Sequence, residues 1–212
     1  MKTITHKSVV ETEIVCSEDN KHTYEVVKRY KDTVGERAYI VLLYPTRTAE
    51  NIWSDDSTLN HLSSHMRELG LNEIRIINLF SKVVNNGKMS AKGLQVDEEN
   101  LNYIDGLMQN KSFSDYKFIV AWGTSMATSY ACQQSKAEVF RMFKTHSPKG
   151  KIYQLYTNDD NIAVDFAHPL FLGIRAKNKI WELQAVKIRQ SMLKLPEQKS
   201  NPILIKEKEL DY

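Results

Sequence analysis

The sequence predicts an α/β protein with one domain built around a mostly parallel central sheet of about four strands. Short, continuous apolar runs rich in branched side chains recur along the chain, as is typical of strands that are buried on both faces. Segments with helical spacing of apolar residues lie between these runs, and such alternation favours right-handed crossovers and a parallel sheet. The 212 residues are 42% hydrophobic and 26% charged, which suits one globular domain with a substantial core.

Four apolar runs predict the strands of this sheet. They cover residues 38–43, 74–80, 118–122 and 152–156. Pro45 ends the first strand, because proline cannot donate a hydrogen bond to a neighbouring strand. A run at 24–30 predicts a further short strand or hairpin ahead of them.

Helices are expected between the strands. They are expected from 56 or 57 to 70, from 97 to about 108, and from just after 125 to 143. Asp56 or Ser57 could cap the first helix, and Gly70 suits its end. Acidic residues at 97–99 open the second helix, where they favour the positive end of the helix dipole.

The two ends of the chain differ from this central pattern. Residues 1–37 are expected to form a polar segment with the short strand or hairpin, as the first part of an α/β domain covering 1–175. Residues 176–212 are expected to form a helix and tail packed on that domain. The helix is predicted by one apolar stripe at helical spacing, which consists of Trp181, Ala185, Ile188, Met192 and Leu195.

Composition excludes several classes of protein and leaves others open. The net charge of +3 permits an anionic partner without requiring one. Cys16 and Cys132 lie far apart and are expected to be free thiols, and the six histidines show no metal-ligand spacing, so no metal or cofactor is expected. The polar N-terminus is unlike a signal peptide, and no apolar run approaches the ~18 residues of a membrane helix. A cytoplasmic protein without a membrane partner is expected, and its oligomeric state stays open.

Polar and aromatic residues follow the predicted strands, at the edge where ligands bind in open α/β sheets. Each has an alternative explanation. The Tyr44–Pro45 pair could be a simple strand end, and Gly123 could only allow a tight turn. Asn78 would cost ~1–3 kcal/mol to bury unpaired, so it either caps a loop or binds a ligand. His168 before proline could be a surface histidine.

Five short motifs occur in a characteristic order. They are Tyr44-Pro45-Thr46-Arg47-Thr48-Ala49, Asp55-Asp56-Ser57-Thr58, Asn78-Leu79-Phe80, Ala121-Trp122-Gly123 and His168-Pro169-Leu170-Phe171-Leu172. Between residues 24 and 173 the chain resembles a bacterial and phage family of unknown function. That family typically carries Asn-Pro-Ser-Thr-Ala, Asp-Asp-x-Thr, Asn-Leu-Phe, Ala-Trp-Gly and His-Pro-Leu-Tyr-Leu.

This layout is in turn similar to the uracil-DNA glycosylase superfamily. The similarity implies a three-layer αβα fold and a protein that binds a flipped nucleobase or nucleotide and hydrolyses its N-glycosidic bond. Asn78 matches the asparagine that reads the base, Trp122-Gly123 matches a Trp-Gly segment, and His168 matches the histidine motif. In the first motif Tyr44 stands where the family has asparagine, and Thr46 where it has serine, which puts the position of the hydrolytic water in doubt.

The resemblance assigns expected roles to individual residues. Tyr44, Thr46 or Asp55 would hold the water, and His168 would stabilise negative charge on the departing base. The residues expected to bind the ligand are Asn78 at the base edge, Trp122 and Gly123 of the Trp-Gly segment, and Leu170 as a wedge. Phe80, Trp53 or Tyr44 could stack on the base, and the alternative for each aromatic is core packing. The expected partner is a nucleic acid or a nucleotide; DNA is the favoured nucleic acid, and the choice between DNA and RNA stays open. The alternatives are a non-catalytic nucleic-acid or nucleotide sensor and an unrelated small-molecule α/β enzyme.

Overall fold

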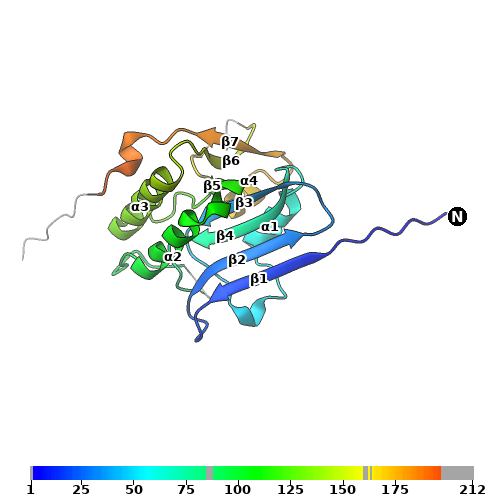
Figure 1. Cartoon of the computed structure of the whole chain (residues 1–212), viewed down its shortest axis with the longest axis horizontal. Coiled ribbons are helices and arrows are strands. Elements are labelled where there is room, and N and C mark those ends of the chain that lie inside the picture. Colours follow the sequence, from blue (N-terminus) through cyan, green and yellow to red (C-terminus); the bar gives the residue numbers. More distant parts are fainter. Residues whose placement is uncertain (1, 85–87, 160–161, 163, 197–212) are drawn as a thin grey trace, which may run out of the picture.

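One large mixed sheet carries the fold (Figure 1). The computed structural model describes residues 2–84, 88–159, 162 and 164–196. Within these residues the strands are β1 (Val10–Cys16), β2 (Thr23–Tyr30), β3 (Glu36–Leu42), β4 (Leu71–Asn78), β5 (Tyr116–Val120), β6 (Ile152–Thr157) and β7 (Trp181–Val186). Their order across the sheet is β1-β2-β4-β3-β5-β6-β7.

The sheet is parallel in its centre and antiparallel toward both edges. Strands β4, β3, β5 and β6 pair in parallel, whereas β1 pairs with β2, β2 with β4, and β6 with β7 in antiparallel fashion. The α/β class is confirmed, but the expectation of about four mostly parallel strands was too small. The outer strands extend the parallel centre into a mixed sheet of seven strands in the described part of the chain.

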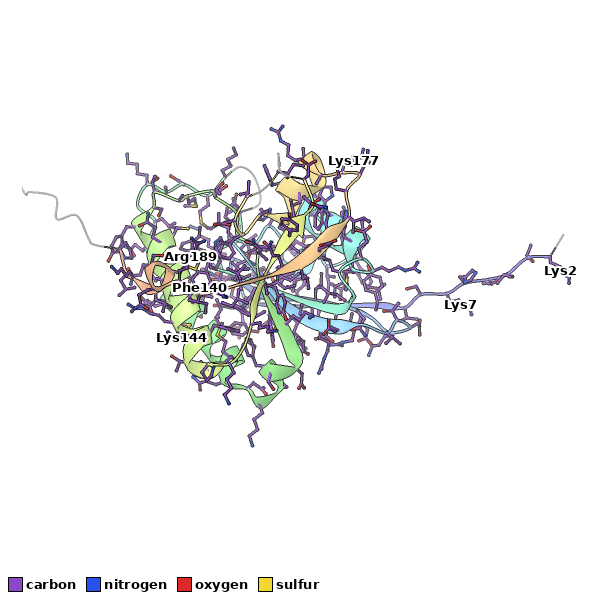
Figure 2. All side chains as sticks on the ribbon, turned by 90° about the horizontal axis from the view of Figure 1, so that it is seen from above. Lys2, Lys7, Phe140, Lys144, Lys177 and Arg189 are labelled. Atoms are coloured by element: carbon purple, nitrogen blue, oxygen red, sulfur yellow. The ribbon has the colours of Figure 1, made fainter. Side chains whose placement is uncertain are left out.

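Strand β1 was not predicted from the sequence; it is held by antiparallel pairing with β2, and Ile14 packs against the core that α1 and α4 share. Its residues alternate between partly buried and exposed, so no apolar run marks it. Arg29 on β2 also pairs with Glu11 at 2.9 Å and with Glu13 at 3.4 Å on β1. Ahead of β1 the chain continues as an arm that leads away from the sheet, with Lys2 and Lys7 along it (Figure 2).

The C-terminal helix predicted after residue 176 is wrong within the described residues 176–196, and the predicted tail from 197 to 212 lies outside them. Residues 181–186 form β7, which pairs with β6, and the Gln154 amide on β6 donates to Gln184 on β7 at 2.7 Å. The unpaired edge of β6 offers backbone hydrogen bonds, and this tertiary context outweighs the helical spacing. Beyond β7, the 3-10 turn Gln190–Leu193 is held to the domain by Arg141, whose Nε donates to the Leu193 carbonyl at 2.8 Å.

Helices cover both faces of the sheet. They are α1 (Ser57–His65), α2 (Glu98–Gln109), α3 (Tyr130–His146) and α4 (Pro169–Arg175), with 3-10 turns at Ala49–Asn51 and Lys111–Asp115. Helices α2 and α3 share one apolar core with the sheet, in which Phe140 is buried (Figure 2). Helices α1 and α4 share the other core. None of the helices in the described part combines the length and apolarity that crossing a membrane requires.

Two helices near the carboxyl ends of the parallel strands differ from those expected. Helix α3 begins later than predicted, at Tyr130, because the Ser129 hydroxyl caps it by accepting from the Cys132 N–H at 3.4 Å. The residues between β5 and this cap therefore form a loop. The segment after β6 ends in the short helix α4, which His168 caps. Both segments lie at the carboxyl ends of the parallel strands.

Gly173 is expected to control how closely α4 packs on α1. A Cβ at Gly173 would lie 2.2 Å from Cγ of His61, so any side chain must displace that ring. Gly173→Ala should destabilise the protein by about 1–3 kcal/mol in urea unfolding, as overpacking does. Adding His61→Ala should recover part of the loss.

The matched control is Gly106→Ala on α2, where a Cβ meets nothing within 4 Å. This change should stabilise the helix by about 0.5–1 kcal/mol, because alanine loses less backbone entropy on folding. A Gly173→Ala protein as stable as the wild type would contradict close packing of α1 and α4.

Candidate functional site

A cavity of about 500 Å³ opens at the carboxyl ends of the parallel strands. Its walls come from β2, β4 and β3, from the loops after β3, β4 and β5, and from the starts of α1 and α4. Six of the predicted site residues line it: Tyr44, Thr46, Asn78, Trp122, His168 and Leu170. They are separated by up to 126 positions in sequence. The parallel pairing of β4, β3 and β5 brings most of them to one edge.

Asn78 lines this cavity, and its side chain is buried. The residue is only 2% exposed, and its Oδ1 accepts no hydrogen bond from any residue the structure describes. Its backbone carbonyl is satisfied, since Nδ2 of Asn100 donates to it at 2.7 Å. A buried acceptor without a donor costs about 1–3 kcal/mol. A ligand that donates a hydrogen bond to Oδ1 would remove this cost.

Asn100 and Asp97 hold the segment around Asn78, and sequence analysis did not find this role. Asp97 caps α2 by accepting from the Asn100 N–H at 3.1 Å. Its second oxygen accepts from the N–H and the hydroxyl of Ser81, at 2.8 and 2.7 Å. The end of β4 is thereby tied to the start of α2. Only the acidic cap was visible in the sequence, because the contact between Asn100 and Asn78 depends on how α2 packs.

His168 is a neutral hydrogen-bond donor at pH 7. Burial lowers its pKa to about 4, although the nearby Asp56 carboxylate opposes this effect. Its Nδ1 accepts the Leu170 N–H at 3.2 Å and so caps α4. Because Nδ1 accepts, the hydrogen of the neutral ring lies on Nε2, which is left as the donor.

Gly123 lets His168 approach the end of β5. It does not line the cavity, but its φ of 70° is a left-handed conformation that favours glycine. A Cβ at this position would lie 3.1 Å from Cβ of His168. The Gly123 N–H also donates to the Phe166 carbonyl at 2.8 Å, two residues before the histidine. Gly123 therefore supports the site without contacting the cavity.

The two adjacent aspartates have different surroundings. Asp55 binds Lys28 and lies 3.5 Å from Nη1 of Arg47, and it does not line the cavity. Asp56 does line it: one oxygen caps α1 by accepting from the Leu59 N–H at 2.8 Å, and the other accepts from the Thr46 hydroxyl. The carboxylate beside the cavity is thus Asp56, which sequence analysis assigned to helix capping alone, rather than Asp55.

Three further residues lie differently from what their expected roles require. Trp53 is 96% exposed on the loop before α1 and lies outside the cavity. Phe80 is buried in the core beneath α2 and α3, also away from the cavity. Leu170 lines the cavity but belongs to the first turn of α4, where it is half-buried. Tyr44 and Trp122 are the aromatic side chains that the structure brings to the cavity wall.

His168 is expected to make the protein less stable as the pH falls from about 6.5 to 4. Its pKa is about 4 in the folded state and about 6.5 when unfolded, so the unfolded chain takes up the proton first. Above pH 6.5 the neutral His168 causes no loss in the free energy of unfolding. Between pH 6.5 and 4 up to roughly 3 kcal/mol of that free energy is lost. Urea unfolding at several pH values would measure it.

The control for this experiment is His168→Asn, because asparagine also caps helices well but does not titrate. The wild type should lose stability with falling pH more steeply than the variant. Parallel pH profiles of the two proteins would show that His168 is not held neutral by the fold.

The chain was compared with protein families, curated proteins and solved structures. A family model described as a protein of unknown function (DUF1643) matches residues 24–170, a segment that contains every described residue lining the cavity. Searches among curated proteins and among solved structures found no match to the chain. Since the family model covers well over half of the sequence, the chain belongs to the DUF1643 family of proteins of unknown function.

Proposed function

We propose that the cavity binds a nucleobase, within a nucleotide or a nucleic acid, and that the protein hydrolyses its N-glycosidic bond. The observation that carries the proposal is the buried, unpaired Oδ1 of Asn78 in the same cavity as the neutral His168. The three-layer arrangement of the uracil-DNA glycosylase superfamily is part of this proposal, and helices on both faces of the sheet are compatible with it.

Recognition of the base would come from the Asn78 amide. A carboxamide offers one acceptor and one donor side by side, which complements a neighbouring donor and acceptor on the edge of a pyrimidine. Apolar side chains, among them Leu42 and Ile76, and the aromatic rings of Tyr44 and Trp122 line the same cavity. A mostly apolar wall with a few fixed polar groups is typical of sites for planar ligands.

Hydrolysis would use Asp56 and His168. Water oxygen bonds to the sugar carbon, the C–N bond breaks, and its electron pair leaves with the base. Asp56 would orient the water and accept its proton, held in place by the Thr46 hydroxyl. The Nε2–H of His168 would donate to the negative charge that develops on the base. Asp56 takes the role that the sequence suggested for Asp55.

Tyr44 favours a second candidate function, a non-catalytic sensor of the same ligand. Its ring lines the cavity at the position where the related family carries a smaller asparagine. A phenol there would occupy space that a hydrolytic water needs. Such a protein would keep the recognition by Asn78 and His168 but would release no base.

Asn78→Ala is expected to weaken base binding by about 10- to 100-fold, because one or two hydrogen bonds in a buried site are lost. Calorimetric titration with a panel of nucleosides would measure this. Asn102→Ala, on the exposed face of α2, is the matched control and should bind like the wild type. Unchanged binding by Asn78→Ala would remove the recognition role.

Asp56→Asn is expected to reduce base release by about 100-fold or more, as loss of a general base does. Asparagine keeps the helix cap, so folding should be retained. The assay is detection of abasic sites in DNA that carries modified or unmodified bases, with Asp115→Asn, at an exposed position outside the cavity, as the paired control. Full activity of Asp56→Asn would contradict the placement of the water.

The same assay separates the enzyme from the sensor. A sensor would bind the ligand without releasing base, and Tyr44→Asn would then be expected to admit water and create activity. An enzyme would be active as the wild type, and Tyr44→Asn would not be needed.

A further inference from the structure

Arg47 carries buried hydrogen-bond donors that the fold does not use. The residue lines the cavity and is only 3% exposed. One guanidinium nitrogen, Nη2, donates to the carbonyls of Asn51 and Ile52, both at 2.9 Å. The other two, Nε and Nη1, are buried and have no hydrogen-bond partner in the part of the chain that the structure describes. Unsatisfied donors on a charged group are costly, so they point to a missing acceptor.

The charge of Arg47 is only partly compensated. The nearest carboxylate oxygen, Oδ1 of Asp55, lies 3.5 Å from Nη1, beyond the usual range for a charged hydrogen bond. Asp55 also binds Lys28, so two cations share one carboxylate. The Asp56 carboxylate also attracts the Arg47 charge, although its own hydrogen bonds come from Leu59 and Thr46. An anionic acceptor at Arg47 would satisfy the free donors of the guanidinium.

Arg47 lies at the opposite end of the cavity from His168. The Thr23 hydroxyl donates to the Arg47 carbonyl at 2.6 Å, which fixes Arg47 beside the start of β2. His168 instead packs against Gly123 after β5. The strands between them follow the order β2-β4-β3-β5, with Asn78 on β4. Three strand spacings put the backbones of β2 and β5 roughly 14 Å apart, which leaves room for a second group of the ligand beside a base held by Asn78 and His168.

We propose that the Arg47 end of the cavity is an oxyanion subsite, and that the ligand is a nucleotide whose phosphoryl group binds there. The inference rests on the proposed function, because it takes Asn78 as the site of the base. Asp56 is the one carboxylate among the described residues that line the cavity, against Arg47 and Lys88, so its wall is net positive. The planar fork of arginine suits two oxygens of a phosphate.

The first test uses the wild-type protein. Nucleoside 5′-monophosphates should bind at least about tenfold more tightly than the matched nucleosides in calorimetric titration, as one charged hydrogen-bonded contact predicts. Inorganic phosphate should compete with the monophosphates and leave nucleoside binding unchanged. Comparing a 5′-phosphorylated trinucleotide with the mononucleotide shows whether the protein prefers a nucleotide within a strand or a free nucleotide. If either of them binds more tightly than the nucleoside, the result supports the subsite.

The second test changes the subsite itself. Arg47→Lys keeps a positive charge beside Asp55 but loses the planar fork, so the advantage of the monophosphate should shrink while nucleoside affinity is kept. Lys149→Gln, an exposed cation just before β6 at the opposite edge of the sheet, is the control for general charge effects. If Arg47→Lys fails to fold by circular dichroism, the wild-type comparison alone decides.

The outcomes separate this inference from the proposed function. Equal affinities for nucleoside and monophosphate, with no competition by phosphate, would overturn the subsite and leave base binding intact. Binding of inorganic phosphate with no contribution from any base would support the subsite and overturn the proposed function. Absence of binding by nucleosides, nucleotides and phosphate would overturn both.

Discussion

The parallel pairing of β3 with both β4 and β5 is the constraint on which the rest of the structure depends. Strand β3 lies in the centre of the sheet, and from Ala38 to Leu42 its residues are buried. Its register with β4 sets Leu42 beside Asn78, so the ends of the two strands coincide. The loops that leave these strands must therefore meet at one edge, and the cavity forms where they meet.

Two groups of buried polar residues differ in how completely their hydrogen bonds are satisfied. Under α2, all four carboxylate oxygens of Glu25 and Glu73 accept hydrogen bonds. The donors are Arg29, Arg75, Tyr103 and Tyr116, at 2.7–3.1 Å. The folded chain therefore satisfies every carboxylate oxygen of this group. In the second group, Asn78 and Arg47 keep unpaired atoms, which the fold alone does not explain.

Much of the fold could be read from the sequence, because its central strands are buried on both faces and appear as continuous apolar runs. The edge strands β1 and β7 could not, since they are partly exposed and their pairing depends on neighbours distant in sequence. The polar and aromatic residues at the strand ends indicated the position of the site, because the register of parallel strands brings residues that follow these strands to one edge of the sheet. The choice between Asp55 and Asp56, and the parts played by Asn100 and Arg47, depend on side-chain contacts that no local pattern records. Trp53 and Phe80 are aromatic like Trp122, and sequence alone gave no means of telling an exposed ring from a core ring or a cavity wall.

The order of the strands also determines when during folding the cavity can exist. Strands β2 and β3 follow each other in the chain, yet β4 lies between them, and β3 pairs with β5 only after two crossovers. The pairings that build the cavity walls, β2 with β4 and β3 with β4 and β5, join segments far apart in sequence. Such long-range contacts form slowly, because large loops must close first. The cavity is therefore a property of the fully assembled sheet, and a ligand of this cavity would bind the native chain alone and raise its melting temperature.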